Sequence, residues 1–249
     1  MRNIKLSIEY DGTNYQGWQI QESPQKTIQG EIERALHIIF KSDISITGSG
    51  RTDSGVHALG QVANFNTEST MPNEEIIRAL NGNLPEDISI LKAEEVDPDF
   101  NARYSAKEKT YKYTILNRRE KPAINRKTCL HFPHKLSMLK MQSACKFLIG
   151  THDFKSFQAF DSSKPERSQD TIRTIKQINV VRKGDYITIF ITADGFLYKM
   201  VRNIVGTLID IGRKEIPPSE IKKILEGKDR ELASNTAPAH GLCLVEVKY

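Results

Sequence analysis

The chain contains 249 residues, of which 38% are hydrophobic and 27% charged, and its formal net charge is +5 at pH 7. This composition is typical of a soluble globular protein, and no apolar run approaches the ~20 residues that a membrane-spanning helix needs. The amino-terminal residues alternate apolar and polar side chains as a strand does, without a signal-peptide pattern. We therefore expect a cytoplasmic protein with no membrane partner.

The three cysteines, Cys129, Cys145 and Cys243, lie far apart and form no CxxC pair. They predict neither a disulfide framework nor a zinc site, and we interpret them as reduced core thiols. His131 and His134 stand in the segment HFPH, where the intervening proline opposes helical geometry and no further ligand adjoins. We expect no metal.

The first hundred residues predict alternating strands and helices. A strand is indicated by apolar residues that alternate with polar ones: Ile4, Leu6, Ile8 and Tyr10. A helix is expected over residues 27–42 with Thr27 as its N-cap, and a second helix begins at Asn73 and ends before Pro85. Further strands are expected at residues 44–49, 61–67 and 88–96.

The rest of the chain repeats this theme without a repeated sequence. Strands are expected at residues 109–117 and 241–249, with a hairpin over 180–191. Helices are expected at residues 196–211 and 219–227 and over the stripe Met138, Met141, Cys145 and Leu148. The fold class is therefore α+β, and we expect two similar α/β domains, residues 1–104 and 105–249.

The charge is distributed unevenly. Residues 1–100 carry eight Lys or Arg and sixteen Asp or Glu, whereas residues 101–135 carry ten and two. Aromatic residues stand among these cations: Tyr104, Tyr111, Tyr113 and Phe132. Such a mixture grips phosphates and stacks on bases, so we favour nucleic acid as the partner over a merely solvated face. The candidate backbone contacts are Arg118, Arg119, Arg126 and Lys127.

The segment GSGRTDSGVHALGQ, residues 48–61, contains four of the fifteen glycines and predicts a shaped loop. Asp53 in such a loop is most often a turn residue that bonds its own backbone. Here it is flanked by Arg51 and His57, which can each contact a phosphate or a base edge, so a substrate site competes with that interpretation. A phosphate-binding loop fits poorly, because the lysine of GxxxxGK[ST] is missing.

Two further residues carry candidate chemistry. Tyr111 shares a strand face with Tyr113, which fits core packing as well as a hydroxyl that reaches a cleft. Arg202 lies in the helix expected at 196–211, one turn before Gly206. A glycine in an apolar helix indicates close packing, so Arg202 is either a surface residue or a partly buried one that needs a carboxylate.

Six stretches, in order, resemble the bacterial tRNA pseudouridine synthase A family: IEYDGTNYQGWQ (8–19), GSGRTDSGVHALGQVANF (48–65), FNARYSAKEKTYKY (100–113), GTHDFKSF (150–157), GFLYKMVRNIVGTL (195–208) and TAPAHGLCLVEV (236–247). The resemblance covers essentially the whole length, and GRTDxGVHA is highly specific. It implies the pseudouridine synthase fold, with two α/β halves, mainly antiparallel sheets flanked by helices and loops, and a catalytic cleft between the halves.

By the same resemblance, Asp53 is the catalytic aspartate, Arg202 is paired with it, Tyr111 contacts the substrate and Arg51 helps to displace the target base. The implied substrate is tRNA, at anticodon stem-loop positions 38–40, and the implied enzyme is a homodimer without cofactor or metal. One departure is Asn235, where a basic residue is expected; this alters at most an RNA contact.

The chemistry explains why a carboxylate is needed. Isomerising uridine requires the C1′–N1 bond to break, the uracil to turn and C5 to bond to C1′, which calls for a nucleophile or base and no redox carrier. The target nucleotide must also be flipped out of its stack. A glycosidase would need two carboxylates, and the loop offers one. A non-catalytic RNA-binding module is the stronger alternative, because binding alone does not need Asp53.

Overall fold

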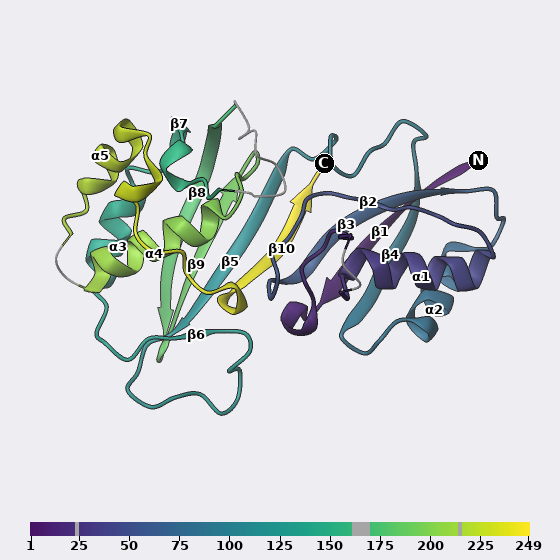
Figure 1. Ribbon diagram of the computed structural model, residues 1–249, viewed down its shortest axis with the longest axis horizontal. Coiled ribbons are helices and arrows are strands. Elements are labelled where there is room, and N and C mark those ends of the chain that lie inside the picture. The colour runs from purple at the N-terminus through teal and green to yellow at the C-terminus, as the bar shows by residue number, and fades with distance from the viewer. Residues whose placement is uncertain (23–24, 161–169, 214–215) are drawn as a thin grey trace. The chain divides into compact units, whose positions relative to one another are not determined.

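The computed structural model describes residues 1–22, 25–160, 170–213 and 216–249. They form two compact units (Figure 1): unit 1 is Met1–Lys107 with Cys243–Tyr249, and unit 2 is Glu108–Leu242. The change from unit 1 to unit 2 after Lys107 lies close to the boundary expected near residue 104. The predicted second domain, 105–249, differs at its end, because the last strand pairs within unit 1.

Unit 1 is built on a sheet in the order β4-β1-β3-β10. Its strands are β1 (Arg2–Tyr10), β3 (His57–Thr67), β4 (Ile88–Val96) and β10 (Leu242–Lys248), and the short β2 (Thr47–Gly48) pairs with β3. β1 runs antiparallel to both neighbours, whereas β10 joins β3 in parallel. The alternating apolar side chains of β1 are buried, as the sequence predicts.

Two helices pack together on this sheet, α1 (Ile28–Phe40) and α2 (Asn73–Asn83), as Figure 1 shows. The side chain of Thr27 accepts a hydrogen bond from the amide of Gly30, which confirms it as the N-cap of α1. α2 begins at Asn73 as expected. Its apolar side buries Ile76 and Leu80, so both helices are held by the same core as the strands.

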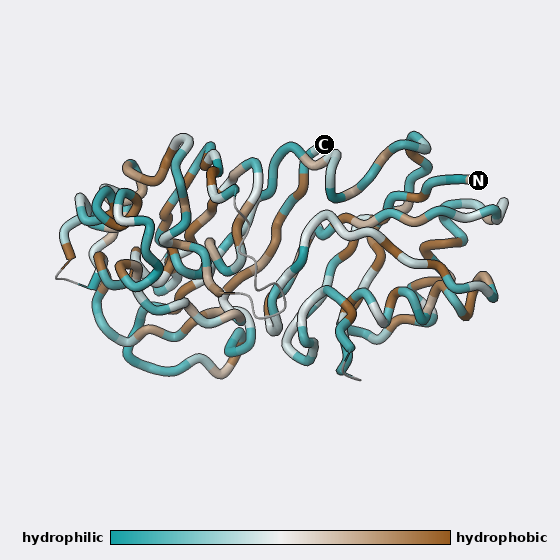
Figure 2. The backbone as a smooth tube through the Cα atoms, turned by 45° about the horizontal axis from the view of Figure 1, so that its top comes forward, coloured by the Kyte–Doolittle hydropathy of each residue, from teal (hydrophilic) through white to brown (hydrophobic). Residues whose placement is uncertain are grey.

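The main strands of unit 2 pair in the order β5-β9-β8-β7. Its strands are β5 (Glu108–Leu116), β7 (Gly150–Asp153), β8 (Ile172–Lys183) and β9 (Tyr186–Ala193), all antiparallel, with β6 (Leu130–His131) parallel to β5. Figure 2 shows apolar residues concentrated in strands and helices, whereas the connection from β5 to β6 is mostly hydrophilic. Each unit therefore pairs a mainly antiparallel sheet with helices.

The helices of unit 2 are α3 (Met138–Cys145), α4 (Met200–Arg213) and α5 (Glu220–Gly227). α4 is almost entirely buried. A Cβ at Gly206, in the middle of α4, would overlap the carbonyl oxygen of Asn235, so the later chain lies directly against the helix backbone. The close packing that the sequence predicts around Gly206 is confirmed, and its partner is the backbone carbonyl of Asn235, the residue that departs from the family pattern.

Three local predictions differ from the structure. The strand expected at residues 44–49 is reduced to β2, and the loop expected at 48–61 is shorter, because β3 already begins at His57. The helix expected at 196–211 begins at Met200, because residues 194–199 are not helical and Lys199 has a φ of 56°. The patterns also missed β6 and β7, which are too short to show a period of their own.

We expect alanine to have opposite effects at two helical glycines. Gly206→Ala should destabilise the protein by about 1–3 kcal/mol through overpacking, because a backbone oxygen blocks the new methyl group. Gly82→Ala in α2, where nothing lies within 4 Å of an added Cβ, should stabilise it by about 0.5–1 kcal/mol through helix propensity. Chemical denaturation of both variants measures this, and a stabilised Gly206→Ala protein would contradict the packing.

Candidate functional site

The loop that carries Asp53 connects β2 to β3 across residues 49–56. Its side chains differ in exposure: Arg51 is exposed, Thr52 is buried and Asp53 is half-buried. The arginine is thus free to reach outward while the carboxylate stays close to the unit 1 surface. This alternation places the two candidate residues of the loop at different depths.

Residues 10–18 support the loop through hydrogen bonds. The Tyr10 and Thr52 hydroxyls lie 2.8 Å apart, and the Trp18 amide donates to the Thr52 carbonyl at 3.1 Å. The Ser54 hydroxyl donates to the Tyr15 carbonyl at 3.1 Å. Burial raises the pKa of Tyr10 well above its ordinary value, so its hydroxyl stays neutral and keeps this contact at physiological pH. The residues on both sides of Asp53 are therefore anchored.

Gly17 brings this support against the Asp53 backbone itself. It has a φ of 90°, and a Cβ there would overlap the Thr52 carbonyl oxygen and lie 3.1 Å from the carbonyl carbon of Asp53. Only glycine allows both the left-handed backbone and the close approach. Because nothing larger than hydrogen fits at Gly17, the two segments touch backbone to backbone. The position of Asp53 is therefore set by a backbone contact more than by flexible side chains.

A buried amide fixes the start of the loop. The Gln61 side chain on β3 accepts from the Ser49 hydroxyl at 2.7 Å and from the Val62 amide at 3.0 Å, and it donates to the Gly50 carbonyl at 2.9 Å. Gln61 is fully buried, so these bonds exchange little with water. Gln61 was not singled out from the sequence, because β3 carries several other polar side chains.

His57 does not lie in the loop where the sequence placed it. It is the first residue of β3 and is only 6% exposed. The amide of Gly12 donates to its Nδ1 at 3.1 Å, and Asp11 Oδ1 lies 3.1 Å from the same nitrogen. The expectation of an accessible loop histidine is therefore wrong, because β3 starts earlier than its pattern indicated. Its geometry is that of a residue that joins the loop to the chain after β1.

In unit 2, Tyr111 and Tyr113 both point to the buried side of β5. Tyr111 is 8% exposed, and its ring meets Phe196 edge-on with centroids 5.2 Å apart. Tyr113 is fully buried and donates to the Pro238 carbonyl at 2.8 Å. Burial raises the pKa of Tyr113, while the positive charge of Arg202 acts to lower it. Tyr113 is thus structural, and Tyr111 is the one with a small accessible part.

Arg202 lies in the first turn of α4 and is half-buried, which fits the second of the two alternatives that the sequence left open. Its Nε donates to the Ala237 carbonyl at 2.7 Å, and its own carbonyl accepts from the Ala237 amide at 3.1 Å. The stem of the side chain is therefore tied to the segment that precedes β10.

The next residue, Asn203, joins three parts of unit 2 and was not singled out from the sequence. Its Nδ2 donates to the Phe157 carbonyl at 2.7 Å, and its Oδ1 accepts from Thr236 at 2.6 Å and from Arg230 at 3.1 Å. These three hydrogen bonds matter because the Asn203 side chain is fully buried and the amide cannot bond to water instead. Its signal was a polar residue on the apolar side of a helix.

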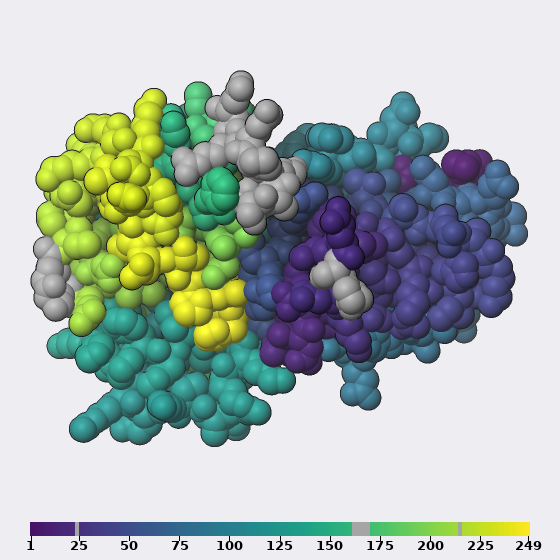
Figure 3. All heavy atoms as spheres, viewed as in Figure 1, coloured from purple at the N-terminus to yellow at the C-terminus, as the bar shows by residue number. Residues whose placement is uncertain are grey.

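The four candidate backbone cations lie in the connection from β5 to β6, which forms a teal projection at the lower edge of Figure 3. Arg119, Arg126 and Lys127 are exposed, as expected. Arg118 is half-buried: its Nη1 lies 3.4 Å from Asp185 Oδ2, and its Nε donates to the Glu120 carbonyl at 3.2 Å. The cations therefore share one loop.

Some features are absent from the described residues. They contain no group of three or more His, Cys, Asp or Glu that could hold a metal ion. No helix within the described ranges is long and apolar enough to cross a membrane. The three cysteines are buried and form no disulfide among the described residues, and burial raises the pKa of the Cys129 and Cys145 thiols.

The structure brings the predicted residues together in two sets. Arg51, Asp53 and His57 belong to unit 1, whereas Tyr111 and Arg202 belong to unit 2 with the cationic loop. The pairing of Asp53 with Arg202 involves residues of different units and stays a prediction.

Comparison with known proteins gives one consistent answer. The profile of the tRNA pseudouridine synthase family matches residues 6–105 and 144–249. Proteins named tRNA pseudouridine synthase A from Caldicellulosiruptor saccharolyticus and Acetivibrio thermocellus are 51% and 48% identical over 249 residues, covering 100% of both chains. One named tRNA pseudouridine synthase A 2 from Clostridium perfringens is 48% identical over 250 residues, again covering 100% of both.

Among solved structures, a chain of an H/ACA RNP bound to a substrate RNA containing 2'-deoxyuridine aligns with 83% of this chain and 53% of its own, with 9% identity and a TM-score of 0.35. That similarity is too low to add to the argument. The full-length relatives and the family profile decide the assignment: the chain belongs to the tRNA pseudouridine synthase family, which isomerises uridine to pseudouridine in tRNA.

Proposed function

We propose that the chain acts on uridines of the tRNA anticodon stem-loop and that the Asp53 carboxylate is its catalytic group. The observation that carries this proposal is the support of the Asp53 loop by residues 10–18 and by Gln61. A turn aspartate that only bonded its own backbone would not need an independently fixed loop. A reacting carboxylate does, because effective catalysis requires its position to be set before the substrate arrives.

The reaction needs the target nucleotide outside its stack, since C1′, N1 and C5 are covered in a helical stem. Arg51 is exposed beside Asp53 and fits the role of filling the vacated position in the RNA. The accessible edge of Tyr111, with its ring held by Phe196, fits contact with the extruded uracil. His57 is given a different role from the one first expected: it supports the loop through Gly12 and does not contact the substrate.

Arg202 is proposed as the second catalytic residue, with the charge that the Asp53 carboxylate requires in a site that excludes water. Its half-buried stem, tied to Ala237, supports a fixed guanidinium. The resemblance to the family further supports a cytoplasmic homodimer that works without cofactor or metal, with the cationic loop from β5 to β6 as a contact for the tRNA backbone.

Asp53→Asn should abolish isomerisation while tRNA affinity stays within about tenfold, or roughly 1.4 kcal/mol, because the lost charge serves the reaction and not a phosphate contact. Pseudouridine formation in an unmodified tRNA transcript and a binding titration measure the two effects. Asp43→Asn, at an exposed carboxylate of the same unit, is the matched control and should leave both unchanged. Retained turnover in Asp53→Asn would remove Asp53 from the catalytic role.

Arg202→Leu should lower kcat by far more than it lowers tRNA affinity, because an uncompensated carboxylate in a partly buried site is disfavoured in its charged form. Arg213→Leu, at the exposed carboxyl end of the same helix, serves as the control and should retain kcat. Single-turnover rates at saturating tRNA separate the two parameters. Equal kcat values for both variants would exclude Arg202 from the chemistry.

Replacing the four loop cations by alanine should weaken tRNA binding and flatten the dependence of log affinity on log salt, by up to about 0.9 units of slope per lost duplex-like contact. Turnover at saturating tRNA should fall much less, because these residues position the substrate. The variant changes Arg118, Arg119, Arg126 and Lys127. A control of equal charge, within unit 1, changes Lys26, Arg34, Arg78 and Lys92. Identical slopes for the two variants would show that the loop is only a solvated surface.

A further inference from the structure

Gln158 follows the short 3-10 helix η2 (Lys155–Phe157) and is only 7% exposed. Among the residues that the structure describes, its Oε1 is the one buried side-chain oxygen or nitrogen without a hydrogen-bond partner. Buried polar atoms in folded proteins are almost always paired, because an unpaired one loses its bonds to water and gains nothing. An unpaired acceptor at this place therefore calls for a donor that arrives from outside the chain.

The neighbours of Gln158 place it beside the proposed catalytic arginine. The carbonyl of Phe157 accepts from Asn203 Nδ2 at 2.7 Å, and the amide of Ala159 donates to the Tyr198 carbonyl at 3.0 Å. Tyr198 and Asn203 stand on either side of Arg202 in sequence. Gln158 is thus held between two attachments to the start of α4.

The same stretch leads to the second substrate residue of unit 2. Phe196, two residues before Tyr198, is the ring against which Tyr111 packs edge-on. Tyr111, Gln158 and Arg202 therefore border one continuous segment, residues 196–203. An aromatic ring, a carboxamide and a guanidinium around one backbone segment are the groups that stack on, hydrogen-bond to and neutralise parts of a nucleotide.

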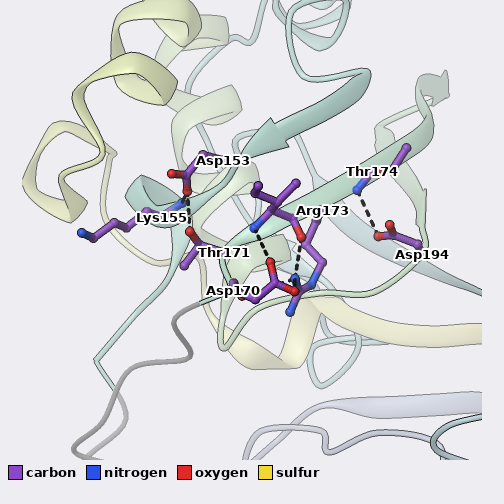
Figure 4. Close-up of polar contacts among 8 residues, drawn as sticks. Asp153, Lys155, Asp170, Thr171, Arg173, Thr174 and Asp194 are labelled. Carbon is purple, nitrogen blue, oxygen red and sulfur yellow. Dashed lines mark hydrogen bonds and ion pairs between the residues drawn. The ribbon is translucent and has the colours of Figure 1, made fainter.

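The turn that presents Gln158 is rigid at its base (Figure 4). Asp153 Oδ1 accepts from the Thr171 hydroxyl at 2.5 Å and from the Lys155 amide at 3.1 Å, and the Phe154 amide donates to the Thr171 carbonyl at 3.0 Å. Burial alone would raise the pKa of Asp153, but its bonds to Thr171 and Lys228 lower it, so the carboxylate stays ionised. A rigid turn fixes where the amide of Gln158 lies.

We propose that the Gln158 carboxamide recognises the uracil base of the flipped nucleotide, with Oε1 accepting from N3–H and Nε2 donating to the adjacent carbonyl oxygen. A carboxamide and the N3–H edge of uracil are complementary, each offering one donor and one acceptor side by side. With the carboxamide in this orientation, cytosine presents an acceptor at N3 and would leave Oε1 unpaired, so cytosine would pair only with the amide turned over. Gln158 would thus make the site selective for uracil; this inference rests on the proposed flipped-nucleotide mechanism.

The test compares uridine with 3-methyluridine at the target position of the same tRNA transcript, since the methyl group removes the N3–H donor. The wild-type enzyme should lose about 100-fold or more in kcat/KM with 3-methyluridine, because a site built around a hydrogen bond rejects an analogue without it. In Gln158→Ala the two substrates should react within about threefold of each other. The matched control is Gln142→Ala. The Gln142 amide of α3 donates to the Val180 carbonyl of β8, and its loss should keep the wild-type ratio of kcat/KM for the two substrates.

The ratio of kcat/KM for the two substrates is insensitive to partial unfolding, because both substrates are assayed with the same protein sample. Gln158→Met preserves the volume of the side chain without its hydrogen bonds. It should also bring the kcat/KM values for uridine and 3-methyluridine closer together, because activity on uridine is lost. A Gln158→Ala ratio equal to that of the wild type would overturn the proposal, as would a wild-type enzyme that accepts both substrates equally. Neither result bears on Asp53, whose role is decided by Asp53→Asn with ordinary uridine.

Discussion

The fixation of the Asp53 backbone by residues 10–18 is the constraint on which the proposed role of Asp53 depends. Ordering a free loop costs roughly 1–2 kcal/mol per residue in backbone entropy. In this chain that cost is met on folding, because Gly17 touches the Asp53 backbone and Trp18 bonds to Thr52. In the proposed reaction, the energy of substrate binding then need not order the loop, and it remains available to extract the target nucleotide from its stem.

Unit 2 is fixed by a buried side chain as well as by a glycine contact. Asn203 bonds at once to the turn at Phe157 and to the segment that holds Thr236 and Arg230. Gly206 admits that segment against the helix backbone. Loss of either feature would release Arg202 at one end and the Gln158 turn at the other, because both attach to the same turn of α4. The arginine and the glutamine are positioned together.

The sequence predicted the parts of the fold that depend on local patterns. Alternation located β1, the cap at Thr27 located α1, and a lone glycine in an apolar helix indicated the packing at Gly206. Two contacts of His57, with Gly12 and Asp11, were out of reach, because they depend on where β3 begins and on pairing across the sheet. Period and propensity describe neighbours in sequence, whereas these bonds join segments more than forty residues apart.

Residues of the candidate site differed in predictability for the same reason. Asp53 could be found because its neighbours in sequence are unusual, and the cationic loop because charge is counted directly. Gln158 could not, since it is an ordinary amide in sequence, and Asn203 offered only the signal of a polar residue on the apolar side of a helix. What distinguishes them is a property of the folded chain: the Asn203 amide is hydrogen-bonded through both its nitrogen and its oxygen, whereas the Gln158 oxygen has no partner. The difference indicates function only because both side chains are buried. An exposed amide would bond to water, so an acceptor without a protein partner would then carry no information.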